Sequence, residues 1–216
     1  MSDFVAGGRS ERLVPRTTEA ENAREVAAMA RSRRGPTVAL WGMAMVIASE
    51  GTLFGCFIGT YYYLRFKSPH WPPLGTPEPK VVVPLILVGV LATTSVPMQL
   101  AAVAARKGRV LATWLLIASA LGVQAGYFGY EVHDFIRQVH ADPIQTDAYS
   151  SIYFTLLGAD HGHVFVGILL DLWLLWKLMR GLTMYRLNAV QVIALYWHVV
   201  NLLTLVIVGV LLSATF

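Results

Sequence analysis

The sequence predicts an all-α fold, a polytopic membrane helix bundle with five transmembrane helices. Hydrophobic residues make up 56% of the 216 residues and charged residues only 14%, and the mean hydropathy is +0.55. A soluble domain of this size cannot hide so much apolar surface in its core. The apolar residues also gather in five stretches, each longer than the roughly 20 helical residues that cross the hydrocarbon layer.

The first 35 residues differ from the rest of the chain. They mix Arg, Glu, Ser and Ala with few large apolar side chains, so we expect a polar cytoplasmic tail at 1–35 and a transmembrane domain at 36–216. The expected spans are 38–64, 82–105, 110–130, 149–179 and 189–214. Between them, 68–79 reads as a rigid proline-rich loop and 133–148 as a polar, acidic connection.

The basic residues predict the orientation of the bundle. Most of the seventeen Lys and Arg residues lie in the tail and in the connections at 106–109 and 177–186. Because loops rich in Lys and Arg stay in the cytoplasm, we expect the amino terminus inside and, after five spans, the carboxyl terminus outside. The other connections carry only Arg65, Lys67, Lys80 and Arg137.

Composition also excludes several kinds of site. A disulfide framework, a zinc ribbon or an iron-sulfur cluster needs several thiolates, and Cys56 is the single cysteine. Its neighbours, Gly55 and Phe57, suggest a small residue packed inside a helix. The net charge of +4 does not indicate a nucleic-acid partner, because the basic residues form no patch along one face.

Small residues predict where helices approach one another. Gly51, Gly55 and Gly59 recur at every fourth position of the first span, so one face of that helix is bare backbone. In lipid such faces allow close helix packing. We expect this face to pack either within the bundle or against a partner chain, and Gly122 and Gly126 repeat the pattern on the third span.

Ionisable side chains within the spans are the candidate functional residues, because each is costly in the hydrocarbon layer. Glu50 is expected near the middle of the membrane. On the fourth span, Asp160, His163, Gly167 and Asp171 share one helix face, and on the fifth span Gln191, His198 and Asn201 do the same. Polar faces on consecutive helices can satisfy each other by hydrogen bonds.

The residues leave two roles open for Glu50, a structural hydrogen-bonded carboxyl and a group that handles protons or contacts lipid. His163 and His198 are expected to be interhelical hydrogen-bond partners rather than metal ligands, because a haem or copper site needs several converging histidines. His161 lies off the polar face and is expected to point elsewhere. Glu131 and Asp134 are expected to be solvated at the end of the third span.

Three passages resemble subunit III of the haem-copper oxidases, the cytochrome c and quinol oxidases of respiratory chains. They are IASEGTLFG on the first span, with Ser49 and Glu50 in the matching places, YFTLLGADHGHVFVG on the fourth and YWHVVNLLTL on the last. The resemblance runs from about Ala39 to Phe216. It is to the five-helix form of the family, which lacks the first two of the seven helices of longer members.

The sequence also departs from the family pattern. Asp160 stands where the first histidine of the fourth-span motif is expected, and Asn201 stands where the family usually has Asp. The Gln-x-x-Glu-Tyr motif of the third span is met only by Glu131, with Phe128 in the Gln place. By resemblance the roles of Glu50, His163 and His198 therefore carry over, and those of the first histidine and the last aspartate do not.

The resemblance implies an accessory subunit with no cofactor or metal of its own. Such a subunit packs on catalytic subunit I, binds phospholipid in its helix clefts, helps deliver oxygen through that lipid and sustains proton uptake. Haem, copper and oxygen reduction would belong to subunits I and II. The setting it implies is a bacterial or archaeal plasma membrane.

Three other functions stay open at this stage. A subunit III homologue can also accompany a nitric oxide reductase. An independent small transporter could use the polar faces of the fourth and fifth spans, although five spans do not divide into two equal inverted halves. A pure scaffold would use only its glycine faces.

Overall fold

The computed structural model describes residues 21, 23, 24, 28, 38–73, 81–141 and 147–213, and within these ranges the regular structure is helical throughout. The elements are α2 (Val38–Lys67), α3 (Val82–Thr93), α4 (Ser95–Arg106), α5 (Val110–Ala141), α6 (Ala148–Leu178) and α7 (Met184–Leu212). With α3 and α4 taken together, five described helices are long and apolar enough to cross a membrane. The predicted all-α bundle of five transmembrane helices is thus confirmed, while the tail expected at 1–35 lies almost wholly outside the described residues.

The second span was expected to be one continuous helix, but it is divided at Thr94 into α3 and α4. Pro97 is the cause, because proline has no N–H to donate to the carbonyl four residues earlier and its ring clashes with that carbonyl. Thr94 N instead donates to Leu91 O at 3.0 Å, a tighter turn than the α-helix makes. The hydroxyl of Thr94 donates to the same carbonyl at 2.7 Å.

The third span does not end near Tyr130, since α5 runs on to Ala141. The polar stretch after Tyr130 holds no proline or glycine before Pro143, and proline disfavours helix in the residue before it. Asp134 also accepts hydrogen bonds from Arg137 and Gln138, one turn further along the same helix. Much of the expected connection at 133–148 is therefore helix.

Side chains cap the starts of α6 and α7, and a glycine forms the turn between them. The Asp147 carboxylate accepts from Ser150 N at 2.7 Å and so caps the start of α6. Thr183 caps α7 in the same way. Between the two helices Gly181 has φ +90°, a backbone conformation that favours glycine. The short turn places α6 and α7 side by side and antiparallel.

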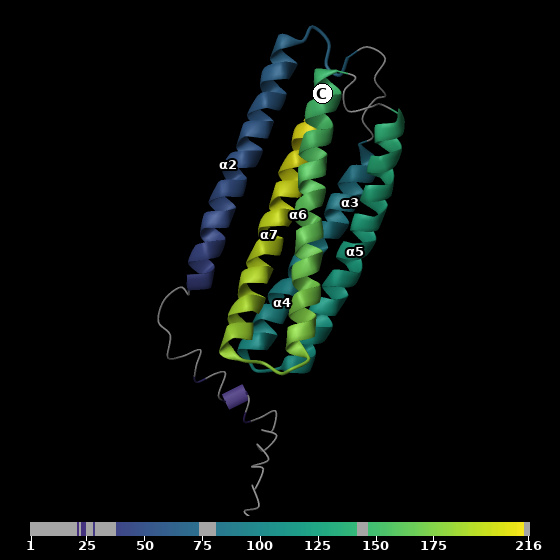
Figure 1. The fold of residues 1–216 in the computed structure, drawn as a ribbon. Helices are drawn as coiled ribbons and strands as arrows, with labels where there is room; N and C mark the ends of the chain where they lie inside the picture. Colours follow the sequence, from purple (N-terminus) through teal and green to yellow (C-terminus); the bar gives the residue numbers. More distant parts are fainter. Residues whose placement is uncertain are drawn as a thin grey trace, which may run out of the picture.

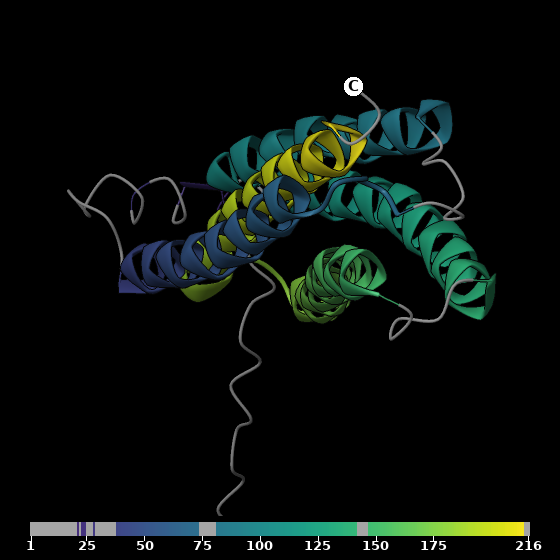
Figure 2. The same cartoon turned by 90° about the horizontal axis from the view of Figure 1, so that it is seen from above.

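α7 is the central helix of the bundle and α2 is its most exposed helix. α7 contacts α2, α3, α4 and α6, and Figure 2 shows it between α2 and the broken span. α2 contacts only α6 and α7 among the described helices, and it stands at one side of the bundle in Figure 1. Within the most apolar part of each span, 56% of α7 is buried but only 6% of α2.

The glycine face of α2 points away from the other described helices. Gly51, Gly55 and Gly59 are all exposed, and a methyl group added at any of them would meet no atom within 4 Å. Cys56 lies inside a helix, as expected, but it is exposed and not packed against the other described helices. The glycine face was expected to pack either within the bundle or against a partner chain. The first of these expectations is wrong for the described helices. Gly122 and Gly126 on α5 likewise have open space around them.

Candidate functional site

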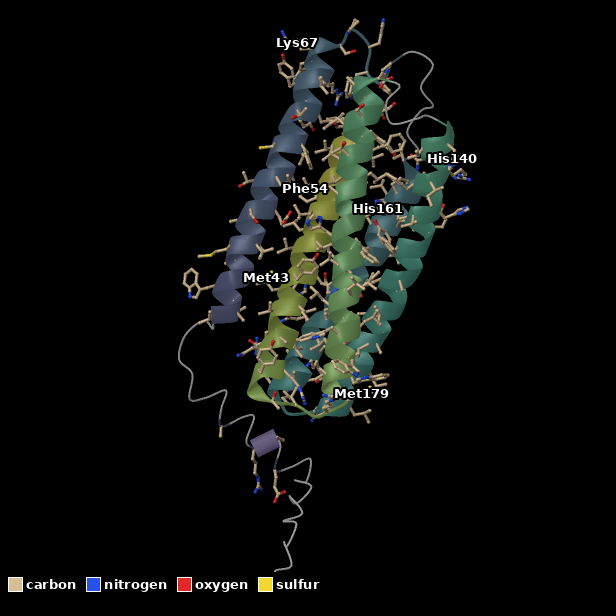
Figure 3. The ribbon with its side chains drawn as sticks, in the orientation of Figure 1. Met43, Phe54, Lys67, His140, His161 and Met179 are labelled. Atoms are coloured by element: carbon tan, nitrogen blue, oxygen red, sulfur yellow. The ribbon has the colours of Figure 1, made fainter. Side chains whose placement is uncertain are left out.

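The centre of the candidate site is one turn of α6, from Asp160 to His163. Successive residues of a helix are about 100° apart around its axis, so neighbours in this turn face different helices. Asp160 reaches α7, His161 reaches α5 and His163 reaches α2. Figure 3 shows His161 near the middle of α6 on the side of α5, and Phe54 of α2 on the other side.

Glu50 and His163 form a pair between α2 and α6. Glu50 Oε2 lies 2.9 Å from His163 Nε2. The side chains keep 28% and 21% of their surface exposed, because α2 covers this side of the bundle incompletely. The ring of Phe54 lies 5.2 Å from the imidazole ring, centre to centre. Tyr196 of α7 donates to the backbone carbonyl of His163 at 2.8 Å.

The hydrogen bonds of His163 determine how many protons the pair holds. His163 Nδ1 lies 2.7 Å from Ala159 O, and a carbonyl oxygen only accepts, so Nδ1 carries a proton. The 2.9 Å contact between Nε2 and Glu50 Oε2 then needs one further proton, on the nitrogen or on the oxygen. The pair is neutral overall in either arrangement, which suits a site inside a membrane.

Asp160 belongs to the interface between α6 and α7. It is 3% exposed, and its Oδ1 lies 2.8 Å from Thr204 Oγ1. The same hydroxyl lies 3.0 Å from Val200 O. The Thr204 hydroxyl is the donor in both contacts, so its single proton is shared between the Asp160 carboxyl and the backbone carbonyl of Val200.

Asp171 lies further along the same face of α6 and has no surface exposed. Neither of its carboxylate oxygens has a hydrogen-bond partner among the described residues. The indole N–H of Trp197 on α7 interacts with it, although the two groups form no regular hydrogen bond. That indole lies against Gly167, where an added methyl group would be 2.6 Å from Trp197 Cζ2. Asp160, Gly167 and Asp171 therefore all face α7, on the side that their spacing predicts.

The polar face of the fifth span was expected to bond the fourth span. His198 and Asn201 instead form hydrogen bonds with the second span. His198 Nε2 lies 3.2 Å from Gln99 Oε1 on α4. Asn201 donates to Ser95 Oγ at 2.7 Å and more weakly to Thr94 Oγ1 at 3.4 Å. The reason is the central place of α7, whose polar face turns toward the break between α3 and α4. His163 and His198 each have the interhelical hydrogen bond expected of them, but with different helices.

Similarity to known proteins is spread over most of the chain. No family model matches it. It is 27% identical over 184 residues to cytochrome c oxidase subunit 3 of Thermostichus vulcanus, covering 83% of this chain and 89% of that protein. It is 28% identical over 169 residues to cytochrome c oxidase subunit 3 of Bacillus sp. (strain PS3), and 28% identical over 161 residues to the probable quinol oxidase subunit 3 of Staphylococcus saprophyticus. These two alignments cover 74% and 73% of this chain, and 78% and 79% of the relatives.

By this similarity the chain resembles the haem-copper oxidase subunit III family. The resemblance found in the three motifs thus agrees with similarity over 73% to 83% of the chain. The described residues include no group of three or more His, Cys, Asp or Glu side chains that could hold a metal ion. The titratable side chains of the described part of the bundle can bind protons and form hydrogen bonds.

A second histidine and carboxylate pair lies on the opposite side of α6. His161 Nε2 is 3.3 Å from Glu131 Oε2 on α5. His161 points away from the polar face of α6, as its place in the sequence predicts. Glu131 was expected to be solvated, and that expectation was wrong, because its side chain is only 16% exposed and contacts His161. The signal in the sequence is the lack of a helix breaker after Tyr130, since continuing the helix brings Glu131 alongside α6.

Proposed function

We propose that this chain is the accessory subunit III of a respiratory haem-copper terminal oxidase in a bacterial plasma membrane. The observation that carries the proposal is the similarity to cytochrome c and quinol oxidase subunits 3 along most of the chain. In the complex it would pack on subunit I, with subunit II as a further partner, and both would supply the haem and copper that reduce oxygen.

The Glu50 and His163 pair is the group that would support proton uptake by the complex. Its position between α2 and α6 and its single shared proton suit a group that binds and releases a proton. Of the two roles open for Glu50, we therefore favour proton handling.

The basic ends of the helices support the proposed orientation, with the amino terminus in the cytoplasm. The end of α6 places the Lys177 ammonium 5.0 Å and the Arg180 guanidinium 4.8 Å from the ring centre of Trp176. Arg106 ends α4 at the same end of the bundle. Tryptophan with Lys and Arg is typical of the membrane interface, where phospholipid headgroups lie. Bound phospholipid is part of the proposal.

The membrane complex isolated through a tag on this chain tests the proposal. We expect haem-containing subunits I and II to co-purify and the complex to reduce oxygen. A complex that reduces nitric oxide instead would mean that the chain is the subunit III homologue of a nitric oxide reductase. A chain that purifies alone, stable and with its own haem, would contradict the accessory role.

Substitution of Glu50 tests the proton role. Glu50→Gln keeps the size of the side chain and can still hydrogen-bond His163, but it cannot release a proton. We expect oxygen turnover of the complex to fall several-fold and proton uptake with it, while assembly stays intact. Thr60→Val is the matched control, because this exposed hydroxyl of α2 bonds only to Cys56 O of its own helix. Unchanged turnover in Glu50→Gln would favour a purely structural subunit.

A further inference from the structure

His161 and His163 place two histidine and carboxylate pairs on opposite sides of one helix. The two histidines are two residues apart, so their side chains leave α6 about 200° apart. His163 meets Glu50 on α2, and His161 meets Glu131 on α5. The second pair is not part of the proposed role of Glu50, and nothing in the sequence motifs assigns it one.

The second pair is the more buried of the two. The side chains of His161 and Glu131 are 9% and 16% exposed, against 21% and 28% for His163 and Glu50. The ring of Phe135 lies 5.6 Å from the His161 ring and covers it on the α5 side. Such an apolar cover makes an unpaired charge costly, so it favours the neutral form of the pair, in which the proton is held. The titratable groups that interact with the pair are Tyr127 on α5 and Tyr153 and Asp160 on α6.

Backbone contacts give this pair the same proton count as the first. His161 Nδ1 is hydrogen-bonded to Leu157 O, and a carbonyl only accepts, so Nδ1 carries a proton. Without a further proton, Nε2 and Glu131 Oε2 would face each other with lone pairs, which repel. One more proton, on either atom, makes the contact favourable. Holding that proton makes the pair neutral, and releasing it leaves a carboxylate beside a neutral imidazole.

Polar side chains lead from the second pair toward the end of the bundle where α5 meets α6. Tyr153 is within electrostatic reach of Glu131, and its hydroxyl donates to Gln138 Oε1 at 3.0 Å. Gln138 in turn donates to Asp134, which is paired with the exposed Arg137. Gln138, Asp134 and Arg137 all lie on α5, on the same side of α6 as the second pair.

We propose that Glu131 and His161 form a second proton-binding site, separate from Glu50 and His163, which exchanges its proton with the water at the end of α5 that carries the exposed Arg137. Exchange moves one proton between the pair and water and leaves every other bond unchanged. Tyr153 is a positioning residue in this proposal, because its hydroxyl holds Gln138 in the polar row. The inference goes beyond the proposed function and does not depend on it.

Infrared difference spectra of the purified protein, alone or with the subunits that co-purify, test the site when they are recorded as the pH is changed in H2O and in D2O. The wild-type spectrum should contain a pH-dependent carboxyl band that is lost in Glu131→Gln and kept in Glu50→Gln. His161→Gln should shift the pH midpoint of this band by about one unit, a tenfold change in proton affinity. A band that is unchanged in Glu131→Gln, or that Glu50→Gln also abolishes, would overturn the separate site.

The access route needs a kinetic readout. Tyr153→Phe removes the hydroxyl that bonds Gln138 and should slow the response of the carboxyl band to a pH jump several-fold, without moving its midpoint. Tyr62→Phe is the matched control, because the Tyr62 hydroxyl contacts Ser213 on α7, away from α5. An unchanged rate in Tyr153→Phe would overturn the route. Should Glu131→Gln not assemble, the midpoint shift in His161→Gln decides the proposal alone.

Discussion

Glycines in the centre and at the edge of this bundle have opposite surroundings. Gly167 of α6 lies against the indole of Trp197, which is fully buried on α7. Gly51, Gly55 and Gly59 of α2 have open space where a side chain would be. The run of three glycines is the stronger pattern in the sequence, yet it is the isolated glycine that permits a close contact. Helix packing inside this chain therefore depends on α7, and α2 is held mainly by polar and aromatic contacts.

The largest effect should follow a methyl group added at the centre. In Gly167→Ala the new carbon would lie 2.6 Å from Trp197 Cζ2, and a buried aromatic ring has no free space to retreat into. We expect a loss of about 1–3 kcal/mol in the free energy of unfolding, measured by unfolding the purified protein in mixed detergent. Gly162→Ala on the same helix is the control, since its methyl group would meet nothing within 4 Å. Equal stability of the two variants would contradict the close contact.

A smaller effect is expected from the polar contact between the same two helices. Thr204→Val keeps the shape of the side chain but removes the hydroxyl that bonds Asp160 at 2.8 Å. Because Asp160 is buried, we expect a loss of about 1–2 kcal/mol for a carboxyl left without its partner. Thr155→Val removes an exposed hydroxyl that bonds only its own helix, and it should change stability little. If Thr155→Val lowers the free energy of unfolding as much as Thr204→Val does, the hydrogen bond between Thr204 and Asp160 adds nothing to stability.

The contrast between α7 and α2 also explains which parts of the fold and site the sequence could predict. Apolar length predicts five spans because every backbone polar group in lipid must be satisfied within a helix. The costly residues, such as Glu50, Asp160 and Asp171, could be picked out one by one for the same reason. Their presence follows from each helix alone.

Partners could not be predicted in this way, because they depend on which helices are neighbours. His163 and Asp160 were placed on one face that was expected to meet the fifth span, but α2 lies close enough for His163 to reach Glu50. His198 turns to Gln99 because α7 is central and has helices on several sides. Glu131 was missed for another reason, since the end of an apolar run was taken as the end of a helix.

The smallest effect is expected at the edge of the bundle. Gly55→Ala adds a methyl group to the outer face of α2, where it meets no atom of the chain. Alanine favours helix over glycine, by up to about 1 kcal/mol in soluble helices, so stability of the purified chain should be unchanged or slightly raised. The same unfolding measurement used for Gly167→Ala tests this. A loss comparable to that of Gly167→Ala would mean that α2 packs through its glycine face after all, and α2 would then have to be turned around its axis. Glu50, which lies on the inner side of α2, could not keep its contact with His163 in that orientation, so the result bears on the proton site as well as on the fold.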